Sequence, residues 1–354
     1  MANLLFVVGS TGGHLYPALS ISQHCYKYSH NCYILAPEST KGKLNLENWN
    51  NIEFHKDLHI KTPYFILDFF KDIRASIRNI IEKKIDVVIS FGSAFCLPPS
   101  LAAKIKNKKL ISIDQNVLPG RTTRLLSYIS DIVVVPFEES KEYIKTRNVK
   151  VMLSPIREEL LALEKGNENT LLFFGGSLGA KTINQLALKF IQNSNKIPKT
   201  IENIIIISGN KLFESFIQEI KSLKNHKEIS IKSDSVEIIN NVKIVVYRYC
   251  SDMANLYRSS AIVICRAGGS TIAEILYLKK KAILIPYPYA LDNHQLYNAE
   301  IASKYANFID YVQEPVDFEL VLKKLEKLLE IYPEYTREIN FFKYDEFFSK
   351  VIQE

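Results

Sequence analysis

The sequence predicts an α/β protein made of two doubly wound, Rossmann-like domains, each built on a parallel sheet. Short apolar runs alternate with longer helical patterns along the 354 residues, and such alternation is typical of α/β folds. The runs are rich in Val, Ile, Leu and Phe and show little polar alternation, which indicates strands buried on both faces of a parallel sheet. The length also favours two domains, because a domain typically has about 150 residues.

Ten apolar runs are expected to form the strands, five in each half of the chain. They are Leu4–Val8, Cys32–Ala36, Val87–Phe91, Leu110–Ile113, Ile132–Val135, Leu171–Phe174, Ile204–Ile207, Ile244–Tyr247, Ala261–Cys265 and Ala282–Ile285. The second half opens like the first: "LLFVVGSTGGHLYPALS" returns as "LLFFGGSLGAKTINQLA", so a strand, a glycine turn and a helix recur. In the first copy we expect Pro17 at the head of the helix.

The charged segment 156–170, which ends in Gly and Asn residues, is predicted to link the domains. The domains are then 1–158 and 159–334, with a C-terminal helix at about 335–354 that can pack back on the first domain. In doubly wound sheets, ligands bind beyond the carboxyl ends of the strands. Two such domains facing across a cleft would therefore bring two ligands together.

Composition restricts the classes of partner. A net charge of +7 favours anionic partners such as nucleic acid, a phosphorylated ligand or an acidic membrane surface. We expect no nucleic acid, because no basic stripe with interleaved aromatic residues accompanies the charge. The five cysteines have no metal-site spacing, so reduced, buried thiols are expected. No run approaches the ~18 apolar residues of a membrane-spanning helix.

The glycine turns fit neither the GxGxxG dinucleotide fingerprint nor the GxxxxGK[ST] phosphate loop. Glycines still let backbone N–H groups approach an anion at a helix N-terminus; the alternative is tight packing of strand on helix without a ligand. A third turn, in "VICRAGGSTIAEIL" (263–276), favours ligand binding. Its Glu274 has two interpretations: a carboxylate that holds the two hydroxyls of a ribose, or a capping box with Thr271.

His14 follows the first glycine turn and is suited to accept a proton near neutral pH. Capping or packing at the helix start is the alternative. The chain has no DxD motif, which many nucleotide-sugar enzymes use to place a metal on the diphosphate. We therefore expect helix N-termini and Arg157 or Arg266 to neutralise a leaving diphosphate, with no metal and no other cofactor.

Five stretches between residues 9 and 300 resemble, in order, the motifs of the MurG family, the peptidoglycan UDP-N-acetylglucosamine transferases of the bacterial inner membrane. "GSTGGHLYPAL" resembles GGTGGH-x-x-PA, and "DQNVLPGRTTRLL" (114–126) resembles EQN-x-x-x-G-x-x-N-RLL. "GGSLGAKTIN" (175–184) resembles GGSQGA-x-x-x-N. "DMANLYRSSAIVICRAGGSTIAEIL" (252–276) resembles DMA-x-x-Y-x-x-AD-x-x-x-CR-x-GA-x-T-x-x-E, and "PYPYALDNHQLYNAE" (286–300) resembles PF-x-x-x-x-x-x-x-Q-x-x-NA.

The resemblance implies a GT-B fold and an inverting hexosyltransferase. Family members move N-acetylglucosamine from UDP-GlcNAc to the muramyl 4-hydroxyl of lipid I, undecaprenyl-pyrophosphoryl-MurNAc-pentapeptide, and so make lipid II for peptidoglycan. The resemblance also implies a peripheral enzyme on the cytoplasmic face of the bacterial inner membrane, in contact with its anionic surface.

The resemblance carries site residues over position by position. Those expected near the donor sugar and the acceptor diphosphate are Thr11, Gly12 and Gly13. Asn116 and Gln295 would contact the donor sugar, Arg157 the nucleotide, Ser177 the diphosphate, and Cys250 the uracil through its backbone. UDP would be cradled by Gly269, Ser270, Thr271, Ile272, Ala273 and Glu274, with Glu274 on the ribose.

The turn "SFGSAFCLP" (90–98) departs from the family's GFGGYVSGP, because Ser93 and Leu97 replace glycines. The resemblance implies that Gly92 and Ser93 hold the acceptor diphosphate. We expect the Ser93 hydroxyl to donate to phosphate; the alternative is a narrowed pocket with the acceptor held elsewhere. Asp114 replaces the family's Glu and competes with His14 as general base, while His14 could instead bind the acceptor diphosphate.

The stretch "TPYFILDFFKDIRASIRNII" (62–81) is predicted to be a helix that docks on a membrane. Its core face would be Phe65, Phe69, Ile73, Ile77 and Ile80. That leaves four apolar residues beside three basic ones: Tyr64, Ile66, Leu67 and Phe70, then Lys71, Arg74 and Arg78. An apolar tip with a basic flank suits anionic lipid. The alternative is that the whole stretch packs inside.

Three other functions stay open. A related GT-B transferase would use the same donor with another lipid or small-molecule acceptor. A UDP-sugar epimerase of similar two-domain shape would consume the donor without an acceptor. A non-catalytic UDP-sugar-binding subunit is the third, although such a protein has less need of His14 and Gln295.

Overall fold

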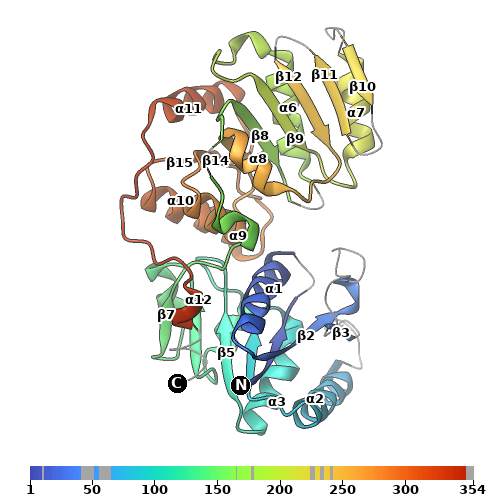
Figure 1. The fold of residues 1–354 in the computed structure, drawn as a ribbon, viewed down its shortest axis with the longest axis vertical. Coiled ribbons are helices and arrows are strands. Elements are labelled where there is room, and N and C mark those ends of the chain that lie inside the picture. The colour runs from blue at the N-terminus through green and yellow to red at the C-terminus, as the bar shows by residue number, and fades with distance from the viewer. Residues whose placement is uncertain are drawn as a thin grey trace. The chain divides into compact units, whose positions relative to one another are not determined.

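The computed structural model describes residues 1–9, 12–40, 52–55, 65–164, 166–176, 179–223, 228–231, 235–239 and 242–347. The chain forms two compact units, each described here by itself (Figure 1). Unit 1 comprises Met1–Arg157 and Ile339–Glu354, and unit 2 comprises Glu158–Glu338. Each unit is a largely parallel sheet with helices packed on it, so the predicted α/β fold class with two doubly wound units is confirmed.

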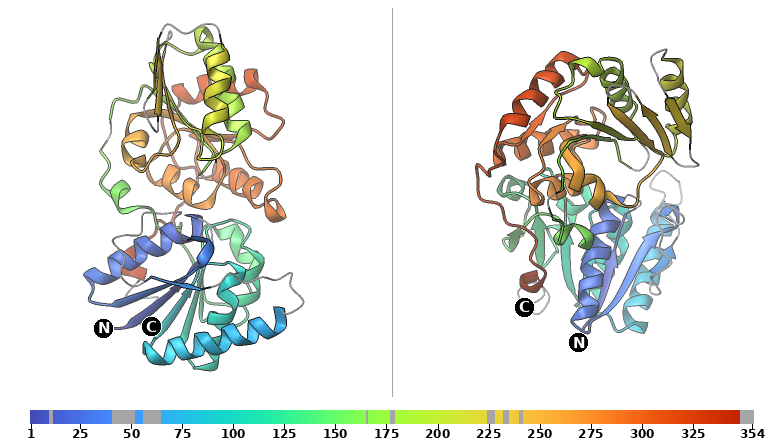
Figure 2. Two further views of the ribbon diagram at one scale, coloured as in Figure 1. Left: turned by 90° about the vertical axis from the view of Figure 1, so that its right-hand side faces the viewer. Right: turned by 45° about the horizontal axis from the view of Figure 1, so that its top comes forward.

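Unit 1 has a sheet whose seven described strands are all parallel, in the order β3-β2-β1-β4-β5-β6-β7. Helix α1 lies on one face, and α2 and α3 lie on the other (Figures 1 and 2). The strands are β1 (Asn3–Val7), β2 (Asn31–Pro37), β3 (Ile52–His55), β4 (Val87–Ser90), β5 (Lys109–Ile113), β6 (Ile132–Val135) and β7 (Val149–Val151). The helices are α1 (Gly12–Lys27), α2 (Phe65–Glu82), α3 (Leu97–Ile105), α4 (Arg121–Leu126) and α12 (Tyr344–Glu346).

Unit 2 has a sheet with eight described strands, in the order β10-β11-β12-β9-β8-β13-β14-β15. The strands are β8 (Thr170–Phe174), β9 (Asn203–Ile207), β10 (Glu228–Ile231), β11 (Ser235–Ile239), β12 (Lys243–Tyr247), β13 (Ser260–Cys265), β14 (Ala282–Leu284) and β15 (Ile309–Tyr311). The helices are α5 (Glu158–Leu161), α6 (Lys181–Gln192), α7 (Phe213–Ser222), α8 (Met253–Ser259), α9 (Gly269–Tyr277), α10 (His294–Tyr305) and α11 (Phe318–Glu330).

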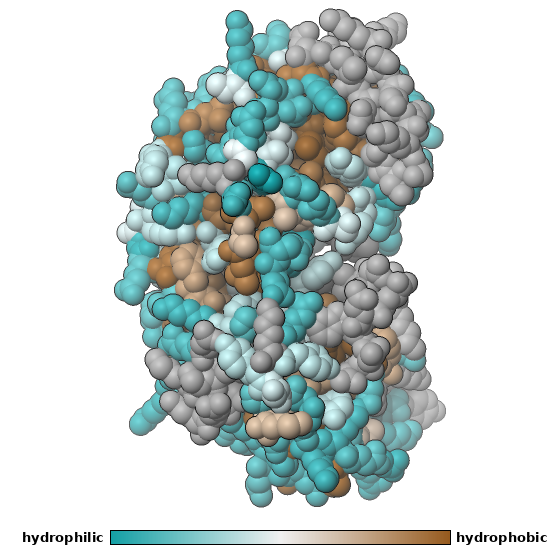
Figure 3. Space-filling view, viewed as in Figure 1, coloured by the Kyte–Doolittle hydropathy of each residue, from teal (hydrophilic) through white to brown (hydrophobic). Residues whose placement is uncertain are grey.

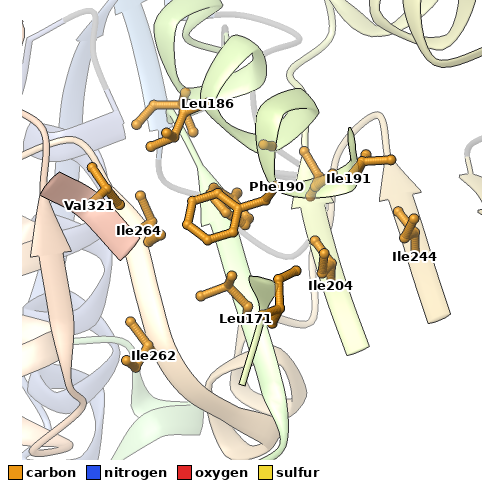
Figure 4. Packing of buried hydrophobic residues seen from close by; sticks show 14 of the residues in the cluster. Leu171, Leu186, Phe190, Ile191, Ile204, Ile244, Ile262, Ile264 and Val321 are labelled. Atoms are coloured by element: carbon orange, nitrogen blue, oxygen red, sulfur yellow. The ribbon is translucent and has the colours of Figure 1, made fainter. Parts of the chain in front are cut away.

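The core of unit 2 lies between the sheet and helices α6, α7 and α11. Phe190 of α6 packs among strand residues that include Leu171, Ile204 and Ile264, as Figure 4 shows. The apolar residues of α6 recur every three or four positions, which turns one face of the helix onto the sheet. Strands β9, β12 and β13 are rich in the β-branched residues Ile and Val, which favour a pleated, buried surface.

All ten apolar runs contain strands, but five described strands, β3, β7, β10, β11 and β15, were not predicted. Helix α1 begins at Gly12, so Pro17 lies inside it and not at its head. The predicted helix at 335–354 is wrong over its described part, since only Tyr344–Glu346 is helical there. Strands β10 and β11 form an antiparallel hairpin at the edge of an otherwise parallel sheet.

Each sheet has a point where the strand order reverses. In unit 1 it lies between β1 and β4, whose last residues pair as Val7 with Ser90. In unit 2 it lies between β8 and β13, where Phe174 pairs with Cys265. Chains leave such a point in opposite directions and open a crevice at the carboxyl edge, where doubly wound proteins bind ligands. The two positions therefore direct the search for function.

Candidate active site

The reversal point of unit 1 brings His14 and Ser93 together. A Cβ placed on Gly9 would lie 2.4 Å from His14 Nδ1 and 2.6 Å from Ser93 Cβ. His14 comes from the first turn of α1, after β1, and Ser93 from the turn after β4. Both side chains are half-buried. Glycine at position 9 is therefore what lets the two polar side chains meet at this edge.

Asp114, at the end of β5, braces the loop that follows it. Its carboxylate Oδ1 accepts from the Asn116 backbone N–H at 3.0 Å, and Oδ2 accepts from Gly120 N at 2.9 Å and Thr123 Oγ1 at 2.6 Å. The side chain is buried. A buried carboxylate is stable when donors satisfy it in this way. Because both carboxylate oxygens accept hydrogen bonds from the segment that follows β5, Asp114 stabilises the conformation of that segment.

In the turn after β4, Gly92 has a backbone conformation that favours glycine, whereas Ser93 and Leu97 do not. Gly92 has φ +74, and a Cβ there would lie 2.7 Å from Thr123 Oγ1. Ser93 has φ −88 and Leu97 has φ −60, which any L-residue adopts without strain. Ser93 and Leu97 therefore stand where a side chain does not strain the backbone. The Ser93 hydroxyl lies 3.6 Å from Cys96 Sγ.

The other predicted residues of unit 1 lie near the same edge. Gly12 and Gly13 form the first turn of α1. Asn116 is half-buried, and its Nδ2 donates to Asp114 Oδ1 at 3.3 Å. The guanidinium of Arg157 lies over the Tyr16 ring, 5.7 Å from its centroid. Thr11 lies outside the described residues.

The first glycine turn of unit 2 is shaped by close packing. A Cβ on Gly175 would lie 2.3 Å from Ala180 Cβ, and one on Gly179 would lie 2.1 Å from Ser208 O. Gly176 differs, because it has φ +88 with open space around it. Packing therefore explains two of the three glycines, and backbone conformation explains Gly176. Ser177 lies outside the described residues.

The second turn of unit 2 leads from β13 into α9. The helix begins at Gly269 with Gly268 as N-cap and no side-chain cap, so the capping-box interpretation of Glu274 is wrong. Glu274 instead accepts a hydrogen bond from Tyr257 Oη at 2.9 Å and is 8% exposed. Gly269, Ser270 and Thr271 are half-buried in the first turn of α9, and Ile272 and Ala273 are buried. Burial, and then the Glu274 charge, raise the pKa of the Cys265 thiol.

Arg266, which we expected as one of two candidates for the diphosphate, has partners inside unit 2. Its Nη1 donates to Ile285 O at 3.0 Å and forms an ion pair with Glu314 Oε1 at 2.6 Å. The Arg266 charge is thus compensated inside unit 2, where it joins the ends of β13 and β14. Gln295, in α10, accepts from the Tyr287 backbone N–H at 3.0 Å.

Two asparagines of the quoted motifs hold the turns in place, a role that the sequence did not reveal. Asn298 Nδ2 donates to Ala267 O, in the turn before α9, at 3.0 Å. Asn184 Nδ2 donates to Ser208 O at 3.1 Å, against the Gly179 turn. The signal in the sequence was that each asparagine lies within one of the stretches that match the family motifs. Tyr257, also a motif residue, was missed as the partner of Glu274.

Cys250 precedes α8 and is half-buried, with Sγ 3.5 Å from Asp252 O. None of the described cysteines is in a disulfide, and Cys25, Cys32, Cys96 and Cys265 are buried as expected. In the described parts of the chain, no three His, Cys, Asp or Glu side chains are grouped so as to hold a metal ion.

A cavity of about 580 Å³ lies elsewhere on unit 2. It is lined by first residues of strands, Thr170, Asn203 and Lys243, and by Ile205, Val245 and Arg258. Figure 3 shows apolar residues over β9 and β12 in this region. The cavity opens on the sheet face that α6 and α7 leave uncovered. It is not the carboxyl edge at which the predicted residues gather.

Helix α2 exposes the apolar residues that we expected at its tip. Ile66, Leu67 and Phe70 are 66%, 60% and 59% exposed, so the alternative in which the whole stretch packs inside is wrong. Arg74 and Arg78 are exposed as well, and Lys71 Nζ lies 3.2 Å from Asp68. Tyr64 lies outside the described residues. Within the described residues, helices long and apolar enough to cross a bilayer are absent.

Two doubly wound units, each with a glycine turn and a helix N-terminus at its reversal point, define the GT-B class of α/β proteins. Solved structures share this fold. MurG of Acinetobacter baumannii has a TM-score of 0.69 at 21% identity, over 93% of this chain and 90% of that one. The UDP-GlcNAc 2-epimerase of Methanocaldococcus jannaschii has a TM-score of 0.65 at 15% identity, over 99% of both chains. The fold alone therefore fits two activities.

Sequence relatives separate these activities. The chain matches the glycosyltransferase family 28 N-terminal domain over residues 4–135 and the family's C-terminal domain over residues 170–351. A relative from Thermoanaerobacter sp. is 32% identical over 92% of this chain and 90% of its own, and one from Chlorobium phaeobacteroides is 29% identical over 91% and 90%. Both are named UDP-N-acetylglucosamine–N-acetylmuramyl-(pentapeptide) pyrophosphoryl-undecaprenol N-acetylglucosamine transferase. The chain belongs to glycosyltransferase family 28, and the protein is a hexosyltransferase.

Proposed function

We propose that this protein moves N-acetylglucosamine from UDP-GlcNAc to the muramyl 4-hydroxyl of lipid I, with inversion at the anomeric carbon. The name shared by its relatives supports both substrates. The observation that carries the proposal is the placement of candidate groups at both reversal points. His14 and Ser93 lie at that of unit 1, and α9 with Glu274 lies at that of unit 2.

Unit 2 holds the donor in this proposal. The half-buried first turn of α9 offers backbone N–H groups and partial positive charge to the diphosphate. Glu274 accepts hydrogen bonds from the ribose hydroxyls. The remaining donor contacts keep the roles implied by the motifs: Gly12, Gly13, Thr11, Asn116 and Gln295 near the sugar, Arg157 at the nucleotide, Ser177 near the diphosphate, and Cys250 at the uracil.

The transfer step needs a base and a stabilised leaving group. The acceptor oxygen attacks the anomeric carbon, the bond from that carbon to the diphosphate oxygen breaks, and the acceptor proton passes to His14. UDP leaves with the electron pair, and the N-termini of α6 and α9 stabilise its charge. We favour His14 over Asp114 as base, because Asp114 already accepts hydrogen bonds from its own loop on both oxygens.

Two variants test the division of roles between the units. His14→Ala should lower kcat by ~10²–10⁴-fold, the range for positioned proton transfer, and leave the Kd of UDP unchanged. Glu274→Ala should weaken UDP binding by roughly 1.5–3 kcal/mol, as for a hydrogen bond to a charged group. Turnover of labelled UDP-GlcNAc and calorimetry of UDP binding measure both. A normal kcat in His14→Ala would exclude it as base.

Ser93 tests the acceptor side. Because its backbone conformation is ordinary, Ser93→Gly changes only the side chain and should be tolerated as the family's residue. Ser93→Ala should raise the acceptor's KM and leave the donor's KM nearly unchanged. If neither variant alters acceptor kinetics, this turn does not hold the acceptor diphosphate, and an acceptor other than lipid I becomes the better interpretation.

The membrane surface is the third proposed partner. Ile66, Leu67 and Phe70 expose an apolar tip on α2 with Arg74 and Arg78 beside it. A lipid-linked acceptor requires the enzyme to reach the bilayer. We propose that α2 lies on the cytoplasmic face of the inner membrane, with its apolar residues in the interface and its basic residues against anionic lipid.

A further inference from the structure

Tyr257 has a position that none of the roles above uses. Its side chain is fully buried, with 0% exposure, in a helix of only seven residues. Its hydroxyl donates to Glu274 Oε2 at 2.9 Å. Its ring meets that of Phe174 edge to face, with centroids 6.2 Å apart. The residue thus contacts two elements that form the unit 2 reversal point.

Those contacts join the parts of the proposed donor site. Phe174 is the last residue of β8 and directly precedes the Gly175 turn. Glu274 lies in α9, the helix that follows β13. Helix α8 itself starts three residues after Cys250, and its N-cap, Asp252, accepts from Asn255 N at 3.1 Å. One side chain therefore contacts both the residue that precedes the proposed diphosphate turn and the proposed ribose carboxylate.

The hydrogen bond matters because glutamate is flexible and its charge is hard to bury. A Glu side chain loses rotamer freedom when it is fixed, and a buried carboxylate needs donors. A buried tyrosine hydroxyl supplies a donor and limits the rotation of the carboxylate before any ligand arrives. A ligand that meets a pre-arranged group avoids that part of the ordering cost.

We propose that Tyr257 is a positioning residue that orients Glu274 for the ribose of the donor nucleotide, an inference that rests on the donor site proposed above. The ligand class is a ribonucleoside diphosphate. The effect of the Tyr257 hydroxyl must then depend on the ribose hydroxyls, because it acts on the nucleotide only through Glu274.

The test compares UDP with 2′,3′-dideoxy-UDP by calorimetry. Tyr257→Phe removes the hydroxyl and keeps the ring against Phe174. Tyr335→Phe is the matched control, since Tyr335 Oη donates to a backbone oxygen of the same helix, Leu276 O, at 2.6 Å. We expect wild type to bind UDP at least tenfold more tightly than the dideoxy nucleotide. Tyr257→Phe should weaken UDP about 5- to 10-fold and leave the dideoxy nucleotide within about twofold; the control should change neither.

Each other result has a distinct meaning. If wild type does not distinguish the two nucleotides, the ribose contact of the proposed function fails and this inference fails with it. If wild type distinguishes them and Tyr257→Phe does so equally well, only the role of Tyr257 is overturned. Equal losses for both nucleotides would mark a merely structural effect and also overturn it.

A second measurement keeps the inference testable if Tyr257→Phe is poorly stable. Glu274→Gln should weaken UDP binding by itself, and adding Tyr257→Phe should then weaken it by less than about twofold. Full additivity of the two losses would mean that Tyr257 does not act through Glu274.

Discussion

Gly9→Ala offers the most direct test of the unit 1 geometry. The new Cβ would lie 2.4 Å from His14 Nδ1 and 2.6 Å from Ser93 Cβ. An ordinary contact needs roughly 3.5 Å, so the imidazole or the turn must move by about 1 Å. A displacement of that size at a reacting group can cost about 10²-fold in rate. We therefore expect kcat for sugar transfer to fall about 100-fold, with the Kd of UDP unchanged.

The control is the same substitution where there is room. Gly120, on the same edge of unit 1, has no neighbour closer than 3.5 Å to an added Cβ, so Gly120→Ala should keep kcat within about threefold. Adding Ser93→Gly to Gly9→Ala removes one close contact and leaves the one with His14, so the double variant should stay slow. The reasoning is refuted if Gly9→Ala alone retains near-normal kcat, or if the double variant recovers fully.

Three further outcomes follow from particular contacts. In Asp114→Asn, the amide cannot accept hydrogen bonds from all the loop donors, so the free energy of unfolding should fall by about 1.5–3 kcal/mol. The pH profile of kcat should keep its shape. If instead stability is normal and the pH profile of kcat loses one of its limbs, Asp114 is the base. The double variant Leu67→Ser/Phe70→Ser should bind anionic vesicles at least tenfold more weakly. The control Ile81→Ser, about 16 Å from Phe70 along α2, should bind as the wild type does. If the double variant still binds, and does so at high salt, α2 does not dock on the membrane. Burial lowers the pKa of His30 below its ordinary 6.5, so the folded protein binds this proton less readily than the unfolded chain does. The stability that His30 contributes is therefore lost as pH falls from 6.5 through the pKa of the folded state. The melting temperature of His30→Asn should depend less on pH than that of the wild type, and equal dependence would contradict this.

Much of the fold could be predicted because buried strands and helices have recognisable patterns of apolar residues in the sequence. Strands covered on both faces appear as continuous apolar runs, so all ten runs contain strands, β6 with its expected bounds. The hairpin β10–β11 carries Glu and Ser within short strands and lacks that signal. The C-terminal segment holds its place through tertiary contacts, such as the Tyr344 ring stacked 4.2 Å from His24. No local pattern reveals such a contact.

The site was harder, because residue type and spacing do not determine partners. Glu274 fits a capping box by spacing, and only the start of α9 at Gly269 excludes it. Arg266 has the right charge for a diphosphate, but Glu314, 48 residues away, compensates it. Asp114 has a side chain that can act as a base, but its carboxylate accepts hydrogen bonds from the residues that follow it. Long-range partners decide what a charged group can do, and they appear only in three dimensions.

The reaction itself is the most direct test of the proposed function. Purified protein is given UDP-GlcNAc labelled in the sugar, with and without a lipid I analogue, and the product and released UDP are followed. We predict release of UDP only with the acceptor, equal in amount to a product that carries a β-linked N-acetylglucosamine on the muramyl sugar. Donor consumption without acceptor, as in an epimerase, or binding of both substrates without transfer, would contradict the account.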